Sequence, residues 1–246
     1  MRDKDTIFFE VCMKIKKLLA YFSLFEWLLW GVSVGVIIFS FFFSQDRYSL
    51  TLIASLLGVT ALIFLAKGNV VGQFLTVVFS LLYAIVSIRF RYWGEMVTYV
   101  FMSLPAAVFS CVSWLKHPSK ESKNEVEVGS MTGKKWLFAS LLSVIVTLLF
   151  YFILRYFDTP NLWLSTLSVS TSFFASALLF LRSRYYAVAY ALNDIVLIGL
   201  WIFASIQSLS YLPMVVCFLA FLCNDLYAFI NWKRIQIRQN QAKNKS

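Results

Sequence analysis

Two aspartates stand inside long apolar segments of the sequence, where a carboxylate is costly and usually faces a cavity or a partner. Asp194 and Asp225 each follow an asparagine, and each precedes a tryptophan, Trp201 or Trp232, by seven residues. Seven residues are almost two helical turns, so each acid shares a helix face with its tryptophan. Because packing alone rarely needs two acids, the pattern favours a cavity lined by polar side chains.

A second polar stripe runs along the segment of Asp225 and consists of Asn224, Tyr227 and Asn231. Asparagines in membrane helices often only hold helices together by hydrogen bonds. Trp232 stands where an interfacial anchor belongs, and that is the preferred interpretation for it. No Lys or Arg lies in an apolar segment. The acids therefore pair with neutral donors, carry a proton or face a cationic ligand.

The first half of the chain has fewer polar residues in its apolar segments, and each of them taken singly favours a structural role over a ligand contact. They are Asn69, Gln73, Thr76, Tyr83, Glu95, Tyr99 and Pro105. Gln73 and Thr76 share one helix face. Pro105 falls in the middle of an apolar segment, where it is expected to loosen a helix and act as a hinge.

Enzyme signatures are missing from the sequence. It has one histidine, His117, and contains no G-x-S-x-G, H-E-x-x-H or phosphate-loop motif, so no catalytic residue, metal site or cofactor is expected. The sharpest enzymatic alternative is an intramembrane aspartyl protease with Asp194 and Asp225 as its dyad. Such enzymes usually show Gly-x-Gly-Asp, whereas Phe221-Leu222-Cys223-Asn224 precedes Asp225 here, which counts against that alternative.

The elements that must position these residues are membrane-spanning helices. Of 246 residues, 60% are hydrophobic and 14% are charged, so a soluble domain could not cover its apolar surface. Continuous rather than alternating apolar runs exclude a β-barrel. The fold class is therefore an all-α polytopic membrane protein. Taking about 20 residues per span, we expect eight transmembrane helices, at 24–43, 49–66, 69–88, 96–115, 136–154, 161–181, 186–207 and 211–232.

The net charge of +10 follows the positive-inside pattern rather than that of a nucleic-acid groove. With the N-terminus in the cytoplasm, all but four of the 22 Lys and Arg lie inside; the four outside are Arg47, Arg89, Arg91 and Arg155. An even number of spans then places the C-terminus in the cytoplasm too. Residues 7–22 form either a short helix on the inner membrane surface or an ordinary basic terminus.

A weak internal repeat relates the two halves. A shift of 118 residues places spans two to four on spans six to eight and aligns Tyr83 with Trp201 and Trp114 with Trp232. A shift of four spans preserves direction, so the two three-helix units are expected to be parallel repeats, a transporter architecture. The expected parts are an N-terminal segment 1–23, an extra helix 24–43, a first bundle 49–115, a loop 116–135, a linker helix 136–157, a second bundle 161–232 and a basic tail 233–246.

Two segments carry a resemblance to a known family. Tyr92-Trp93-Gly94-Glu95-Met96, continuing to Trp114-Leu115-Lys116-His117, resembles the first-half motif of PnuC-type nicotinamide riboside transporters; Asn193 to Trp201 and Asn224 to Arg234 resemble the second-half motif. The resemblance implies two parallel three-helix bundles joined by a linker helix, as in SWEET proteins. It implies facilitated uptake of nicotinamide riboside without ATP or a coupling ion, followed by trapping by a cytosolic nucleoside kinase.

We therefore predict a transporter in the cell membrane that is not an enzyme. The resemblance implies ligand contacts from Asn193, Trp201, Asn224 and Tyr227 with Gln73, and the residue pattern adds Tyr83 and Asp194 to the expected substrate-binding set. Other nucleosides or vitamins, such as deoxynucleosides, thiamine or riboflavin, stay open as ligands. The expected partners are a small-molecule nucleoside and membrane lipids but no nucleic acid, and a homo-oligomer stays open.

Overall fold

The computed structural model describes residues 20–43, 49–89, 93–122, 124–159, 161–207 and 212–244. Residues 7–19 of the predicted helix at 7–22 lie outside the described residues. Within them all regular elements are helical: α2 (Leu24–Phe43), α3 (Ser49–Ala66), α4 (Val70–Arg89), α5 (Trp93–Thr98), the π-helix η1 (Tyr99–Ser103), α6 (Leu104–Lys116), α7 (Gly133–Tyr156), α8 (Leu162–Phe180), α9 (Tyr186–Gln207) and α10 (Leu212–Lys243).

The predicted all-α class with eight spans is confirmed for the described residues. Eight stretches are long and apolar enough to cross a membrane, with α5, η1 and α6 forming one of them at Trp93–Lys116. Predicted and observed bounds differ by less than one helical turn, except that α10 continues from the predicted end at 232 to Lys243.

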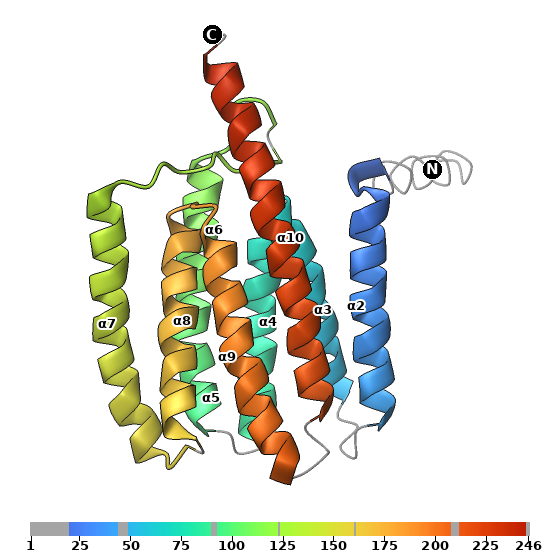
Figure 1. The fold of residues 1–246 in the computed structure, drawn as a ribbon, viewed down its shortest axis with the longest axis vertical. Coiled ribbons are helices and arrows are strands. Elements are labelled where there is room, and N and C mark those ends of the chain that lie inside the picture. The colour runs from blue at the N-terminus through green and yellow to red at the C-terminus, as the bar shows by residue number, and fades with distance from the viewer. Residues whose placement is uncertain are drawn as a thin grey trace, which may run out of the picture.

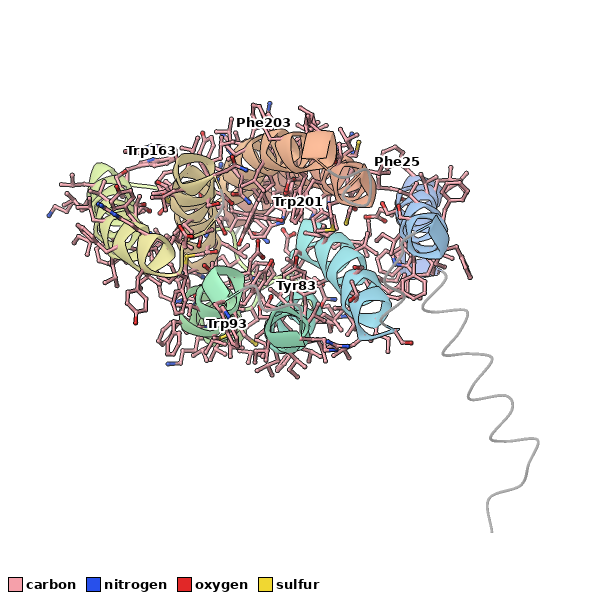
Figure 2. The ribbon with its side chains drawn as sticks, turned by 90° about the horizontal axis from the view of Figure 1, so that it is seen from below. Phe25, Tyr83, Trp93, Trp163, Trp201 and Phe203 are labelled. Atoms are coloured by element: carbon pink, nitrogen blue, oxygen red, sulfur yellow. The ribbon has the colours of Figure 1, made fainter. Side chains whose placement is uncertain are left out.

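Six helices close into a ring around the middle of the molecule (Figures 1 and 2). Around this ring α3 packs on α4, α4 on α6, α6 on α8, α8 on α9, α9 on α10, and α10 back on α3. Outside the ring, α2 packs on α3 and α10, and α7 packs on α8. Successive helices alternate in direction, so α2 begins and α10 ends at the same end of the molecule, here called the basic end (Figure 1).

The two sets of ring helices run in matching directions. In Figure 1, α3, α4 and α6 point up, down and up, and α8, α9 and α10 do the same. These directions are those that a parallel repeat requires. The division of the chain into two bundles and a linker stays a prediction, because all six helices share one ring.

The outer surface of the molecule is apolar. On α7 the side chains of Leu141, Ile145, Leu148 and Phe152 are all more than half exposed. Figure 2 shows Trp163 and Phe203 at the rim of the molecule as well. An exposed apolar belt of this kind suits contact with lipid and would be unusual in a water-soluble protein.

Two tryptophans lock the ring at its basic end, and we call them the tryptophan clasp. Trp114 of α6 donates from Nε1 to the carbonyl of Leu179 on α8 (3.1 Å), and Trp232 of α10 donates to the carbonyl of Leu65 on α3 (2.9 Å). Their ring centroids are 5.5 Å apart. The interpretation of Trp232 as an interfacial anchor is wrong, because its side chain is fully buried.

The loop between α6 and α7 is an ordered strap across the basic end, defined here as residues 117–129 without the undescribed residue 123. The amide of Val126 donates to the carbonyl of Gly68 in the α3–α4 turn, and the amide of Gly129 donates to the carbonyl of Arg182 in the α8–α9 turn, both at 2.9 Å. The Gln239 side chain of α10 accepts from the amide of Val128 and donates to the carbonyl of Val126.

Ion pairs add to these contacts and explain why α10 continues beyond residue 232, the predicted end of its span. Arg238 pairs with Glu121 and Glu125, and Lys243 pairs with Glu127 at 2.5 Å. The hydrogen bond from Lys243 holds the pKa of Glu127 below its usual value. The last turns of α10 are therefore stabilised by the strap.

The fourth span is not a uniform helix. Pro105 cannot donate a backbone hydrogen bond. The π-helical turn η1 ends two residues before it, at Ser103, and the Leu104 amide donates to the carbonyl of Tyr99. π-Turns inside helices are often found at functional sites. The loosening expected at Pro105 is therefore present, while its role as a hinge stays a prediction.

Candidate ligand site

A cavity of about 560 Å³ lies inside the ring. All six ring helices line it, together with α5, η1 and part of α2. Its volume falls in the range of pockets that enclose small organic ligands. The lining mixes aromatic rings, carboxyl groups, amides and hydroxyls, and it contains most of the polar residues singled out in the sequence.

Five of the seven residues predicted to bind substrate line this cavity. Gln73 and Tyr83 come from α4, and Asn193, Asp194 and Trp201 come from α9. Figure 2 shows Tyr83 and Trp201 in the interior between the helices, on opposite sides of it. The Asn193 amide is oriented by α8, since its Oδ1 accepts hydrogen bonds from Thr171 at 2.8 Å and Ser168 at 3.2 Å.

The other two predicted residues, Asn224 and Tyr227, are not among the lining residues and contact α2. Asn224 donates to the hydroxyl of Ser33 at 3.2 Å, and the Tyr227 hydroxyl donates to Glu26 at 2.6 Å. Asn231, the third member of their stripe, donates to the carbonyl of Ala66 on α3. In this conformation the stripe holds α2 and α3 against α10.

Glu26 is a buried acid that was not among the residues predicted from the sequence. Its buried carboxylate binds Lys67 at 3.0 Å as well as Tyr227, and so joins α2 to the α3–α4 turn and α10. The signal was present in the sequence, because Ser23 and Glu26 form a capping box at the start of α2. The Ser23 amide donates to Glu26, and the Glu26 amide donates to the Ser23 hydroxyl.

The charged groups that line the cavity are all acidic. Glu95, Asp194 and Asp225 contribute carboxyl groups, and among the described lining residues there is no Lys or Arg. Asp194 and Asp225 are both buried and line the cavity from the neighbouring helices α9 and α10. Buried acids around one cavity without a basic partner favour a cationic ligand beside them.

Several buried polar atoms of the lining lack a hydrogen-bond partner within the described protein. They are both amide atoms of Gln73, the hydroxyls of Thr51, Ser110 and Tyr186, and Oδ2 of Asp194. Buried polar groups are nearly always paired in folded proteins. Unpaired atoms gathered around one cavity therefore indicate a place for a polar ligand or water.

Aromatic rings form one side of the cavity. Tyr83 and Tyr99 lie with ring centroids 4.3 Å apart, and Phe79 lies beside both. Tyr99 belongs to the polar residues noted in the first half of the sequence, but it is not in the predicted substrate-binding set. Trp201 lines the cavity from the other half of the chain. Ring faces on two sides suit a flat ligand.

Comparisons with known proteins agree with this description. Residues 48–234 match the family model described as nicotinamide mononucleotide transporter. The nicotinamide riboside transporter PnuC of Neisseria mucosa is 26% identical over 218 residues, 87% of this chain and 82% of that protein. Its namesake in Haemophilus influenzae is 24% identical over 192 residues, covering 78% and 82%.

A solved structure shows the same fold. The crystal structure of the vitamin B3 transporter PnuC superimposes with a TM-score of 0.72 over 89% of this chain and 94% of that one, at 24% identity. Because the family model covers well over half of the residues, the chain is a multi-pass membrane protein that belongs to the nicotinamide mononucleotide transporter family.

Proposed function

We propose that this protein carries nicotinamide riboside across the cell membrane by facilitated uptake. The two curated relatives bear the name of that activity. The observation that carries the proposal is the cavity lining, in which carboxyl groups are the charged side chains and aromatic rings stand on two sides. Nicotinamide riboside combines a fixed positive charge with a flat ring, so it matches both features.

The same lining favours the riboside over the mononucleotide of the family's name. A phosphate is usually held by Arg, Lys or a helix N-terminus. Among the described lining residues the charged groups are Glu95, Asp194 and Asp225, which would repel a phosphate. We infer that the phosphorylated form is excluded, and that phosphorylation by a cytosolic nucleoside kinase traps the riboside after uptake.

We assign the five lining residues to different parts of the ligand. Trp201 and Tyr83 offer ring faces to the cationic ring, an attraction of about 0.5–2 kcal/mol. Gln73 and Asn193 can donate and accept hydrogen bonds to the ribose, and Asp194 adds a negative charge. We assign Asn224 and Tyr227 to holding α2, because their donors are engaged with Ser33 and Glu26.

The proposal includes a carrier without catalytic activity and with both termini in the cytoplasm. The basic end of the molecule collects Lys and Arg from the strap, from the α8–α9 turn and from the end of α10, in line with the positive-inside rule.

Uptake into liposomes that hold the purified protein tests the carrier directly. Labelled nicotinamide riboside should equilibrate across the membrane without ATP or an ion gradient, and excess mononucleotide should not compete. Liposomes without protein are the control. Equal competition by the mononucleotide would contradict the assignment of the riboside. Cleavage of a membrane peptide that is lost in Asp194→Ala and Asp225→Ala would support the protease instead.

Two variants separate charge recognition from stacking. Asp194→Asn should weaken binding of nicotinamide riboside and affect a neutral nucleoside much less, because only the cation gains from the carboxylate. Trp201→Ala should weaken both, because both lose a stacking surface. Calorimetric titration of each variant with both ligands measures the difference. Equal losses for both ligands in Asp194→Asn would show that the acid is structural.

A further inference from the structure

We propose that the end of the cavity next to the tryptophan clasp is a subsite for the sugar hydroxyls of the ligand. It is formed by the side chains of Gln73, Ser110 and Tyr186, here called the polar floor. The inference deepens the proposed function and rests on it, because it takes the ligand to be a riboside. It adds Ser110 and Tyr186 to the residues that contact the ligand, and it predicts the direction in which the ligand lies.

Two residues of the polar floor lie directly against the tryptophan clasp. Ser110 precedes Trp114 by four residues on α6, which is about one helical turn. The ring of Tyr186, the first residue of α9, packs against Trp232 with ring centroids 4.9 Å apart. Both residues also line the cavity. The clasp therefore lies beneath their side chains and closes the cavity toward the basic end.

Gln73 reaches the same place from α4. It follows Gly72, where a Cβ would lie 2.7 Å from the backbone nitrogen of Leu65, so the two backbones are in close contact. Leu65 is the residue whose carbonyl accepts the hydrogen bond from Trp232. Gln73 lines the cavity as well. The polar floor is therefore assembled from three ring helices, α4, α6 and α9, around the two indoles of the clasp.

The polar atoms of the floor have no hydrogen-bond partner within the described protein. This holds for Oε1 and Nε2 of Gln73, Oγ of Ser110 and Oη of Tyr186. All three residues are buried, with exposed fractions of 0%, 1% and 1%. The amide and the two hydroxyls can both donate and accept hydrogen bonds. Because buried polar groups are nearly always paired, three unpaired groups from three helices suit a ligand that brings its own donors and acceptors.

The charged side chains of the lining lie away from the polar floor. Asp194 follows Tyr186 by eight residues on α9, and Asp225 precedes Trp232 by seven residues on α10. At 1.5 Å per residue these separations are about 10–12 Å along the helices. Glu95, the third acid, belongs to α5 at the opposite end of the molecule (Figure 1). The floor therefore suits an uncharged polar group, while the cationic part of a ligand stays beside the acids.

The aromatic rings predicted to stack on the ligand also lie away from the floor. Tyr83 follows Gln73 by ten residues on α4, about 15 Å along the helix. Trp201 follows Tyr186 by 15 residues on α9, about 22 Å along the helix. An elongated riboside then lies along the cavity with its flat cationic ring toward Tyr83 and Trp201. Its neighbouring 2′- and 3′-hydroxyls lie on the floor, where one amide can donate to one hydroxyl and accept from the other.

Calorimetric titration of the full-length protein in nanodiscs tests the inference with three ligands: nicotinamide riboside, its 2′-deoxy form and its 3′-deoxy form. Ser110→Ala and Tyr186→Phe each remove one hydroxyl and keep the shape of the side chain. Each should weaken binding of the riboside about three- to tenfold, the effect of one hydrogen bond. With at least one deoxy form the same variant should cost less than about twofold, because a hydrogen bond that is already absent cannot be lost again.

Ser143→Ala is the matched control. Ser143 is a buried serine of α7, outside the ring, and its hydroxyl donates to the carbonyl of Ala139 at 2.8 Å. This variant should bind all three ligands like the unaltered protein. The melting temperatures of Ser110→Ala and Tyr186→Phe without ligand should not fall, since the hydroxyls that they remove have no protein partner.

Two results would overturn the inference and leave the proposed function standing. One is unchanged affinity of both floor variants for the riboside, which would mean that the floor holds only water. The other is an equal loss for the riboside and both deoxy forms, which would mean that the variants distort the cavity. An unaltered protein that binds none of the three ligands would refute the proposed function, and the inference with it.

Discussion

Gln73 and Gln239 are both buried glutamines, but only Gln239 has hydrogen-bond partners for its side-chain amide. Gln73 is fully buried and neither atom of its amide has a partner among the described residues. Gln239 uses both amide atoms to bond the strap at Val126 and Val128. An unsatisfied buried polar group costs about 1–3 kcal/mol. Without a ligand or water beside it, Gln73 therefore lowers the stability of the protein, whereas Gln239 raises it.

Leucine at each of these positions should give opposite results. Gln73→Leu should leave the melting temperature unchanged or raise it, and should weaken riboside binding about tenfold through lost hydrogen bonds. Gln239→Leu should lower the melting temperature and leave the affinity unchanged. Thermal unfolding and titration of both variants give the two readouts. A Gln73→Leu protein that unfolds earlier and binds normally would mean that Gln73 is a packing residue.

At the scale of elements, the strap depends on one close approach. A side chain on Gly129 would place its Cβ 2.3 Å from the carbonyl oxygen of Leu181, which is closer than atoms can lie. Gly129→Ala must therefore push the strap off the α8–α9 turn and break the hydrogen bond to Arg182. We expect a loss of about 1–3 kcal/mol in unfolding free energy and faster proteolytic cleavage in the strap.

Gly133→Ala is the matched control for that prediction. Gly133 begins α7, four residues further along the chain, and a Cβ there meets no atom within 4 Å. This variant should unfold like the unaltered protein or slightly later, because alanine favours a helix. Similar cleavage rates for Gly129→Ala and Gly133→Ala would show that the strap is not held at Arg182.

The positions of the helices were predictable from the sequence. Which neighbour each face of a helix contacts was only partly predictable. Span positions follow from apolar length, which the bilayer fixes. The partners of polar residues depend on which arc of a helix meets which neighbour. Asn224 and Asp225 are adjacent on α10 and about 100° apart around it, so one contacts Ser33 of α2 and the other lines the cavity. The sequence alone did not place α2 beside α10.

At the scale of the whole molecule, the alternation of eight spans places the start of α2 and the end of α10 on one side of the membrane (Figure 1). In a variant without native cysteines, Asp158→Cys in the turn between α7 and α8 should react in intact cells with a maleimide that cannot cross membranes. Gln241→Cys near the end of α10 should react only after the cells are opened. Labelling of Gln241→Cys in intact cells would contradict the proposed orientation.

The tryptophan clasp has a consequence for the order in which a ribosome delivers the chain. Trp114 of the first half donates a hydrogen bond to Leu179 of the second half. Leu65 of the first half accepts one from Trp232, which lies in the last span. The first three ring helices therefore enter the membrane with an indole N–H and a carbonyl that find their partners only when the second half has been synthesised. A nascent chain that stops before α10 lacks the hydrogen bond from Trp232, and its ring of helices stays open. Such a chain is a substrate for membrane quality control.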